Sequence, residues 1–281
     1  MKISLIFTPS ELNRNFSECR NRDKHMGHIP PSSLLSVAAV LEKEGVEVQL
    51  IDMVAEGLSY EDTLRRIKEF SPVMLGFTLA TYGFHSVMDW IKKFKKDTQL
   101  PILAGGAHAI IYPDETMTHP DIDYLILGEA DYPLPKFINC FKNGLNFDGM
   151  KSFGYRKNGQ VIIDKAIENI KDIDNVPFPS LHLIKNELYG SILSQRKNYT
   201  ALMSSRGCPY RCTFCDQKKI PYRMRSPKSF VEEVKRNYTQ FGIKDFDVWD
   251  STFTANKKRV MEICELLEKE KMNINWYIRA R

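Results

Sequence analysis

Residues 199–215, YTALMSSRGCPYRCTFC, combine an apolar run with three closely spaced cysteines. The run Tyr199–Met203 has the composition of a β-strand and leads through a short polar segment to the cysteines. Cys208, Cys212 and Cys215 stand at the spacing C-x3-C-x2-C. Iron–sulfur clusters are held by cysteine thiolates, normally four of them. Three thiolates on one loop therefore predict a cluster with one iron open to a substrate or cofactor.

Other uses of these cysteines stay open from the residues alone. A disulfide framework belongs to small, cysteine-dense secreted chains, and six cysteines in 281 residues do not fit that class. A structural zinc site usually shows paired cysteine or histidine arms, whereas His182, the nearest preceding histidine, has no partner at a recognised spacing. A zinc site and plain thiols remain the alternatives. Cys19, Cys140 and Cys264 stand alone and are interpreted as ordinary thiols, with Cys264 on a helix face.

The motif C-x3-C-x-aromatic-C after a first strand resembles the signature of the radical S-adenosylmethionine (SAM) enzymes. The resemblance implies that Cys208, Cys212 and Cys215 hold a 4Fe–4S cluster. It also implies that SAM binds the fourth iron, where one electron cleaves it to methionine and a 5′-deoxyadenosyl radical. By the same resemblance, Phe214, the aromatic residue of the motif, is expected to pack near SAM.

Composition and charge are those of an ordinary soluble protein of two domains. Hydrophobic residues make up 43% and charged residues 27% of the 281 residues. The net charge of +5 is scattered among acidic residues, which favours a solvated surface and argues against nucleic-acid binding. The sequence has no apolar run of membrane-spanning length, and its start is too short for a signal-peptide core. We therefore expect a cytoplasmic, reducing compartment.

Residues 1–145 alternate apolar runs with helical patterns. The expected strands are Lys2–Thr8, Glu47–Asp52, Val73–Thr78, Pro101–Ala104 and Tyr124–Leu127. The expected helices are Ser33–Glu44, Ser59–Phe70, Tyr82–Lys96, a short one near Pro113–Met117, and Asp131–Lys142. Strands separated by such helices predict a parallel sheet covered on both faces. Five strands suit a flavodoxin-like, doubly wound α/β domain, which binds ligands at the carboxyl ends of its strands.

Three loops at those carboxyl ends contain glycine. They are Gly76–Leu79, Ala104–His108 and Leu127–Asp131. Glycine lets a backbone approach a large ligand closely, and amides at helix N-termini favour phosphate. One such loop is a weak signal because glycine turns are common in doubly wound folds. Three at the same end of one sheet predict a ligand site.

The whole segment resembles the cobalamin-binding domain that precedes many radical SAM cores. The resemblance rests on Pro30-Pro31 before the helical stretch 34–41, on Gly45 with the strand that ends at Asp52, and on the stretches 105–108 and 123–129. In that family, the loops after the third, fourth and fifth strands enclose the nucleotide tail of cobalamin. The resemblance implies a set of cobalamin contacts made up of Thr78, Gly105, Gly106, Gly128 and Glu129.

Many cobalamin domains also provide a histidine ligand to cobalt within the motif D-x-H-x-x-G. Asp23–His28 comes close to this motif, but its glycine lies one position early, in the long loop Pro9–Ser32. His25 or His28 is therefore a candidate cobalt ligand, with solvated loop histidines as the alternative. The resembled radical enzymes often lack this histidine.

Residues 146–198 are expected to form a connector. Ser152–Arg156 and Gln160–Asp164 predict a hairpin around Asn158-Gly159, and the segment Ile173–Pro179 breaks regular structure. From residue 199 to 281 the alternation restarts. The expected elements are the strands Tyr199–Met203, Asp245–Trp249 and Asn273–Arg279 and the helices Pro227–Phe241 and Lys257–Lys271.

This second series resembles the first half of the (β/α)6 partial barrel of radical SAM enzymes. By that resemblance, Asp250 lies where SAM binds, and Arg279 lies at a similar strand end. A surface or ion-pair role is the alternative for both residues. The later strands of such a barrel do not follow Arg281, so we expect the chain to be C-terminally truncated.

Together these resemblances imply a cobalamin-dependent radical SAM enzyme. The expected reaction is methyl transfer to an unactivated carbon, although the family also contains ring-forming members. The expected partners are a small-molecule or natural-product substrate and an electron donor such as flavodoxin or ferredoxin. A non-catalytic cobalamin-binding module with a vestigial cluster loop is the alternative.

Overall fold

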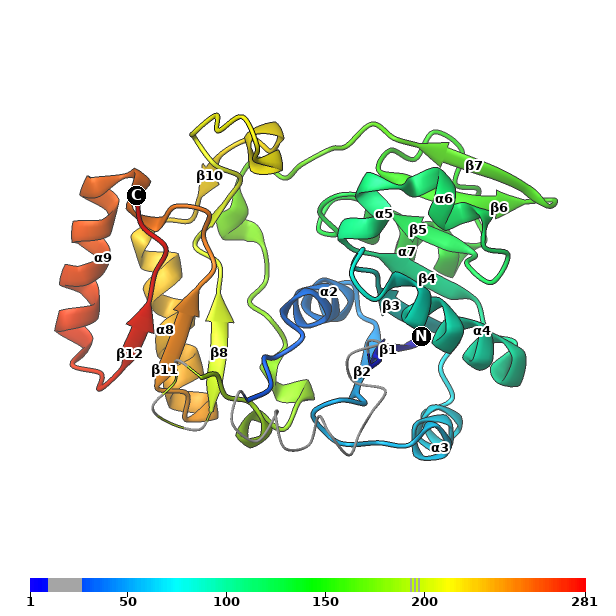
Figure 1. Cartoon of the computed structure of the whole chain (residues 1–281), viewed down its shortest axis with the longest axis horizontal. Coiled ribbons are helices and arrows are strands. Elements are labelled where there is room, and N and C mark those ends of the chain that lie inside the picture. Colours follow the sequence, from blue (N-terminus) through cyan, green and yellow to red (C-terminus); the bar gives the residue numbers. More distant parts are fainter. Residues whose placement is uncertain (10–26, 193, 195, 197) are drawn as a thin grey trace. The chain divides into compact units, whose positions relative to one another are not determined.

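A computed structural model describes residues 1–9, 27–192, 194, 196 and 198–281 (Figure 1). The described residues form two compact units. The first unit contains residues 1–9 and 31–170, and the second contains residues 27–30 and the described part of 171–281. Residues 27–30 therefore belong to the second unit, although they precede residues 31–170 of the first unit in the sequence.

The first unit is built on one seven-stranded sheet of order β2-β1-β3-β4-β5-β6-β7. The strands are β1 (Lys2–Phe7), β2 (Glu47–Asp52), β3 (Met74–Thr78), β4 (Ile102–Gly105), β5 (Tyr124–Ile126), β6 (Phe153–Lys157) and β7 (Gln160–Asp164). The first five strands pair in parallel. Their order, 2-1-3-4-5, is the flavodoxin-like order that the sequence predicts.

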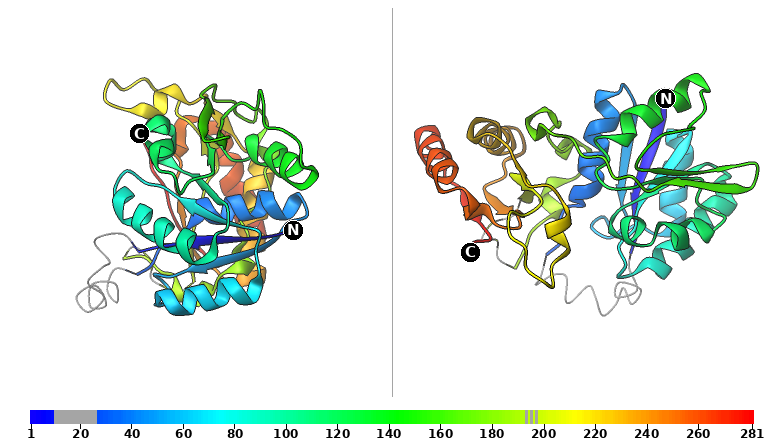
Figure 2. Two further views of the ribbon diagram at one scale, coloured as in Figure 1. Left: turned by 90° about the vertical axis from the view of Figure 1, so that its right-hand side faces the viewer. Right: turned by 90° about the horizontal axis from the view of Figure 1, so that it is seen from above.

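Helices lie on both faces of this sheet (Figure 2). They are α2 (Ser32–Lys43), α3 (Tyr60–Phe70), α4 (Phe84–Thr98), α5 (Ala107–Ile111), α6 (Pro113–Thr118) and α7 (Pro133–Asn143). The α3 and α4 helices meet through Tyr60 and Phe94, whose ring centroids are 4.9 Å apart. The α2 and α7 helices also lie together, and Lys142 Nζ donates to the Glu44 carbonyl at 2.6 Å. The expected α/β layers are confirmed.

The predicted hairpin forms, and it extends the sheet of the first unit. Its turn residues Asn158 and Gly159 have φ angles of 51° and 79°, as a two-residue hairpin turn requires. The β6 strand pairs antiparallel with both β5 and β7. Phe153 and Tyr155 are buried, and Phe153 packs on Phe137 of α7 at 5.4 Å between centroids. Burial of these rings explains why the hairpin joins the sheet.

The second unit contains a three-stranded parallel sheet of order β12-β11-β8. The strands of this sheet are β8 (Tyr199–Leu202), β11 (Asp245–Val248) and β12 (Asn275–Tyr277). The second unit also contains the strands β9 (Ser205–Arg206) and β10 (Arg223–Met224) and the helices α8 (Pro227–Phe241) and α9 (Lys257–Glu270). The short strands β9 and β10 pair with each other. Ser226 caps α8, and Asn256 caps α9 by accepting from the Arg259 amide at 3.0 Å.

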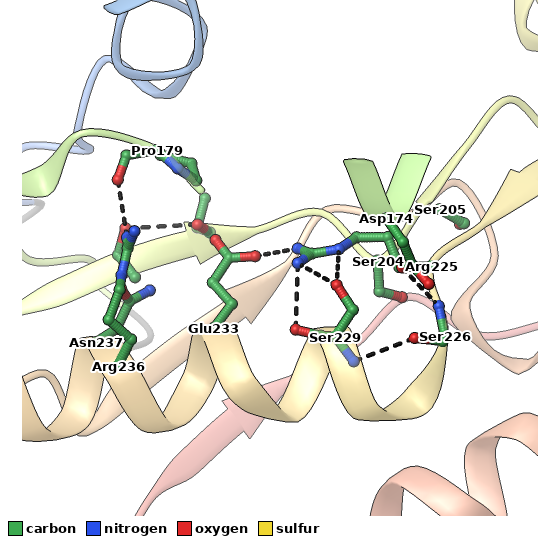
Figure 3. A network of polar contacts seen from close by, with 12 residues as sticks. Asp174, Pro179, Ser204, Ser205, Arg225, Ser226, Ser229, Glu233, Arg236 and Asn237 are labelled. Carbon is green, nitrogen blue, oxygen red and sulfur yellow. Dashed lines mark hydrogen bonds and ion pairs between the residues drawn. The ribbon is translucent and has the colours of Figure 1, made fainter. Parts of the chain in front are cut away.

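A polar network lies along α8 (Figure 3). Arg225 and Glu233 form a buried ion pair, and Arg225 Nη2 also donates to the Ser229 hydroxyl at 2.9 Å. The ring of Phe178 lies 4.8 Å from the Arg225 guanidinium carbon and 5.1 Å from that of Arg236. Two cations therefore contact one aromatic ring, an arrangement that stabilises the segment before β8.

Two further hydrogen bonds fix the same segment to α8 (Figure 3). The Ser226 amide donates to Asp174 Oδ1 at 2.9 Å, and Arg236 Nη2 donates to the Pro179 carbonyl at 2.8 Å. The proline-rich segment that the sequence predicts to be irregular is thus held at both of its ends. Among the described residues, no helix is long and apolar enough to cross a bilayer.

Candidate functional site

The cysteine loop follows the carboxyl end of β8, where the sequence places it. Cys208, Cys212 and Cys215 are free, half-buried thiols, and the Cys215 amide donates to the Cys212 carbonyl at 3.2 Å. Gly207 begins the loop with a φ of +72°, and a Cβ there would lie 2.4 Å from the Ile220 carbonyl oxygen. Only glycine fits this close backbone approach. Sequence reasoning missed Gly207, although its place directly before the first cysteine was visible.

Two other strand ends of the second unit reach the same loop. Cys208 Sγ lies 4.0 Å from Thr252 Oγ1, which follows β11. Arg281 follows β12, and its Nη1 donates to Cys212 Sγ at 3.7 Å. The Arg281 guanidinium also lies 4.4 Å from the ring centroid of Tyr210. Arg281 therefore places a cation beside the second cysteine of the loop. The sequence analysis did not name Thr252 or Arg281 as site residues.

The donor set fits an iron–sulfur cluster by its chemistry, because three unpaired thiols share one eight-residue loop. The side chains are not gathered into a ready-made site, since the described residues contain no cluster of three or more metal-binding His, Cys, Asp or Glu side chains. Phe214 is 90% exposed at the tip of the loop. In the described residues, the three thiols are therefore not assembled around one point, and the Phe214 ring is exposed to solvent.

Asp250 connects the ends of β8 and β11. Its Oδ1 accepts from the backbone amides of Ser204 at 2.7 Å and Ser205 at 3.0 Å, and its Oδ2 accepts from the Ser204 hydroxyl at 2.5 Å. The residue is buried. Both carboxylate oxygens thus accept hydrogen bonds from residues that directly precede the cysteine loop. Direct SAM binding by Asp250 stays a prediction.

Arg279 forms an ion pair with Asp247, one of the alternatives that the sequence left open for Arg279. Burial opposes ionisation of Asp247, but hydrogen bonds from Arg279 and Trp249 outweigh it and lower the pKa of this carboxyl. Tyr199 Oη donates to Asp247 Oδ2 at 3.1 Å. The ion pair ties β11 to the segment after β12 and fixes the strand end from which Arg281 extends.

The predicted cobalamin contacts lie at the carboxyl ends of the adjacent strands β3, β4 and β5. Thr78 ends β3, Gly105 ends β4, and the Leu79 amide donates to the Gly105 carbonyl at 2.7 Å. Gly128 follows β5 with a φ of +75°. The structure thus brings Thr78, Gly105 and Gly106 together and places Gly128 and Glu129 in the next loop. Their contact with cobalamin stays a prediction.

Gly106 is required by the backbone itself. Its φ is +107°, and a Cβ there would lie 2.6 Å from the Leu79 carbonyl oxygen and 2.9 Å from Thr78 Oγ1. The loops after β3 and β4 can therefore meet only if this residue has no side chain. The fit between these loops depends on Gly106 whether or not a ligand is bound.

Replacing Gly106 with alanine is expected to destabilise the first unit by about 1–3 kcal/mol, because the new methyl group meets backbone and the conformation suits glycine alone. Gly149→Ala is the matched control, since Gly149 also has a positive φ but nothing lies within 4 Å of the place that its new methyl group would take. Urea unfolding of both variants in a Trp249→Phe, Trp276→Phe background compares them, because the fluorescence change then arises from Trp90 in α4 of the first unit. Equal losses in both variants would show that the loop contact contributes nothing.

The two candidate cobalt ligands differ in what the structure describes. His25 lies outside the described residues. His28 lies in the second unit, where its backbone bridges to Tyr189 and its carbonyl accepts from the Gly190 amide at 2.9 Å. The role of either histidine as a cobalt ligand stays a prediction.

Comparison with known proteins agrees with the two units. The family of the B12 binding domain matches residues 23–138, and the radical SAM superfamily matches residues 202–280. The chain therefore contains a B12-binding domain followed by a radical SAM domain.

The relatives of this chain include methyltransferases and a cyclase. An uncharacterised methyltransferase of Pyrococcus horikoshii is 29% identical over 100% of this chain and 60% of its own length. Cytidylyl-2-hydroxyethylphosphonate methyltransferase of Streptomyces wedmorensis is 27% identical over 83% of this chain and 53% of its own length. Anaerobic magnesium-protoporphyrin IX monomethyl ester cyclase of Synechocystis is 26% identical over 88% of this chain and 50% of its own length. The chain spans only about half to three-fifths of these relatives.

A solved structure shares the fold. The cobalamin-dependent SAM radical enzyme OxsB, solved with aqua-cobalamin and SAM bound, matches 98% of this chain and 38% of its own. The TM-score is 0.75 at 24% sequence identity. This likeness supports the fold of the chain, in which a doubly wound sheet precedes the start of a partial barrel.

Proposed function

We propose that the full-length protein binds cobalamin, SAM and a 4Fe–4S cluster and transfers a methyl group to an unactivated carbon. One observation carries the proposal. A single chain joins a 2-1-3-4-5 sheet with glycine loops at its carboxyl edge to a second parallel sheet whose first strand ends in three free cysteines. Two of the relatives named above are methyltransferases, which favours methyl transfer.

The chain's own residues supply binding and orientation. When bound, the cluster would supply the electron that cleaves SAM, and cobalamin the methyl group. Cys208, Cys212 and Cys215 are the proposed cluster ligands. The guanidinium of Arg281, close to Cys212, offsets the negative charge that three thiolates bring to one loop. Asp250 holds the base of that loop through Ser204 and Ser205.

The remaining proposed contacts follow from position. We propose that Phe214, which is exposed on the cysteine loop, packs against SAM. Asp250 is also proposed to bind SAM. The proposed contacts of the cobalamin tail are Thr78, Gly105, Gly106, Gly128 and Glu129. Their backbone amides and carbonyls lie at the edge where doubly wound sheets bind ligands.

The partners are proposed from chemistry and from the relatives. A small-molecule or natural-product substrate is proposed because the named relatives act on a nucleotide-linked phosphonate or a porphyrin. Cleavage of SAM consumes one electron, so a donor such as flavodoxin or ferredoxin is proposed. A reducing cytoplasm suits free cysteines and an oxygen-sensitive cluster.

Ring formation is the second candidate reaction. It rests on the 26% identity to the anaerobic cyclase. A non-catalytic cobalamin-binding module is a third candidate, favoured by the observation that the three thiols are not gathered in the structure. The proposed cofactor contacts are the same for the two reactions, so only product analysis of the full-length protein separates them.

Anaerobic reconstitution tests the proposal. The chain is loaded with iron, sulfide and hydroxocobalamin, and its optical and EPR spectra are recorded with and without SAM. We expect a cluster signal that shifts when SAM is added, together with bound cobalamin. Cobalamin without a cluster would support the non-catalytic module. Colourless protein that contains zinc would contradict both.

A further inference from the structure

The cysteine loop is closed at its base by a short neck, defined here as residues 204–206 and 223–225. Within the neck, β9 and β10 pair antiparallel, and the Arg225 amide donates to the Ser204 carbonyl at 2.9 Å. Figure 3 shows Ser204 beside Arg225. Both residues are buried, whereas most of residues 207–222 are exposed. The two ends of the loop therefore meet in the interior of the second unit, and the three thiols lie beyond them.

One arginine binds both sides of this neck. Arg259 lies in the first turn of α9 and is 6% exposed. Its Nε donates to the Arg225 carbonyl at 2.8 Å, and its Nη2 donates to the Ser204 carbonyl at 3.0 Å. A guanidinium presents its N–H groups as a rigid, planar fork, so one side chain can hold two carbonyls at a set separation. Arg259 thus connects residues that lie on opposite sides of the cysteine loop in the sequence.

Packing alone does not account for an arginine at this place. Burying a charged group costs free energy, and burial lowers the pKa of Arg259 for that reason. The first turn of a helix also disfavours a cation, because its free amides carry positive partial charge. Both hydrogen bonds that this side chain donates in the described part of the chain go to the neck. Contact with the neck is therefore what offsets the cost of burying the charge.

Asp250 adds a second hold on the neck. Its carboxylate accepts from the amides of Ser204 and Ser205, and its negative charge favours the cation of Arg259. The amide, the hydroxyl and the carbonyl of Ser204 are thus all bonded to buried side chains. By contrast, the three thiols beyond the neck are not gathered among the described residues. The base of the loop is fixed by protein groups alone, and only the part beyond it has to rearrange around a cluster.

We propose that Arg259 is a positioning residue for the iron–sulfur cluster, because it holds the two ends of the cysteine loop at the separation from which three thiols reach one cluster. This inference rests on the proposed function and adds to it a residue outside the loop. Ends that are held in advance reduce the conformational entropy that the loop loses when a cluster binds. Loss of this hold should therefore weaken cluster binding without removing any ligand.

Arg259→Lys tests the hold on the neck. Lysine keeps the positive charge and suits a helix, but its ammonium is a single compact donor group. We therefore expect it to keep at most one of the two hydrogen bonds. Arg236→Lys is the matched control, since Arg236 donates to the Pro179 carbonyl and to Asn237, outside the neck.

A second control separates positioning from stability. Ile263 is fully buried and lies one turn further along the same face of α9. Ile263→Ala leaves a cavity and should lower the urea midpoint of the second unit at least as much as Arg259→Lys, without removing a bond to the neck. Arg259→Gln and Ile263→Val replace these variants if they do not fold.

The first measurement uses the iron-free chain. Hydrogen exchange followed by mass spectrometry reports on the amides of Ser204, Ser205 and Arg225, which all donate hydrogen bonds within the neck or to Asp250. In Arg259→Lys their exchange should be about tenfold faster than in wild type, the effect of one lost hydrogen bond from a charged group. In the Arg236 control it should stay within about twofold of wild type.

The second measurement uses the chain reconstituted with iron and sulfide. The iron affinity of Arg259→Lys should fall about tenfold, the lower end of the range for residues that support metal ligands, while both controls keep the affinity of wild type. The EPR spectrum of the reduced cluster in Arg259→Lys should be broader than in wild type, and its shift on adding SAM smaller, because the thiols are no longer held in one arrangement.

Each other outcome counts against the inference. Unchanged exchange at the neck in Arg259→Lys would show that the guanidinium does not hold the loop. Faster exchange with the iron affinity and EPR spectrum of wild type would show a purely structural role. An equal loss of iron in Ile263→Ala would show that the loss follows stability. A wild-type chain that takes up no cluster would overturn the proposed function and the cluster role of Arg259, and exchange in the iron-free chain would still decide whether Arg259 holds the loop.

Discussion

Cys212→Ala should abolish cluster assembly while leaving cobalamin binding intact. Cys212 is the middle cysteine of the loop, and it is the thiol that Arg281 contacts at 3.7 Å. With one of three thiolates removed, a 4Fe–4S cluster retains two protein ligands. The iron bound after reconstitution should fall more than about tenfold, since losing even a supporting residue of a metal site costs 10–100-fold in affinity. Iron and sulfide analysis and the absorbance of the cluster measure the loss.

The control removes a different thiol from the same unit. Cys264 is a half-buried free cysteine on α9, outside the cysteine loop. Cys264→Ala should therefore keep the iron content of wild type. Cobalamin binding should be equal in both variants, because the proposed cobalamin contacts lie in the other unit. An iron content in Cys212→Ala close to that of wild type would show that the loop does not hold the cluster.

Glu233→Ala is expected to have the largest effect on stability. Glu233 is the acidic partner of Arg225, and both side chains are at most 9% exposed. Removing the carboxylate leaves a buried guanidinium without its counter-charge, which costs about 3–5 kcal/mol. The same guanidinium contacts Phe178, so loss of the pair should also loosen the segment before β8. The second unit should unfold at a lower urea concentration.

Fluorescence can report on that unit alone. The chain has three tryptophans, of which Trp249 and Trp276 lie in the second unit. In a Trp90→Phe background, the fluorescence change on unfolding arises from the second unit. Glu232→Ala is the control, because Glu232 is the exposed neighbour of Glu233 on α8. A shift in Glu233→Ala no larger than that in Glu232→Ala would mean that the buried pair adds no stability.

Local signals predicted much of the fold. The strand Glu47–Asp52 has the expected bounds, and Ser59 caps α3 by accepting from the Asp62 amide at 3.1 Å. Asn256 caps α9 as expected. Such features depend on residues within one turn of each other, so the sequence states them directly. The five-residue helix α5 was missed because it has no capping side chain and is too short to show a periodic pattern.

Features that depend on distant residues could not be predicted. Nothing near Phe153 shows that its strand pairs with β5, because the rings that bury it come from other elements. The contact of Arg281 with Cys212 joins positions far apart in the sequence. Nε2 of the buried His108 has no hydrogen-bond partner among the described residues, and this becomes visible only once the loops after β3 and β4 are placed against each other. The sequence placed the candidate loops, whereas packing determines which atoms face one another.

The pairing of His28 with Tyr189 has a consequence for synthesis of the protein on the ribosome. His28 precedes almost all of the first unit, yet its backbone is held within the second unit through Tyr189 and Gly190. Translation proceeds at about 5–20 residues per second, so His28 waits on the order of 10–30 s before its partners are made. By then residues 31–170 have been made and can already fold. During synthesis, the segment around His28 can therefore pair with Tyr189 and Gly190 only after the residues of the first unit have been made.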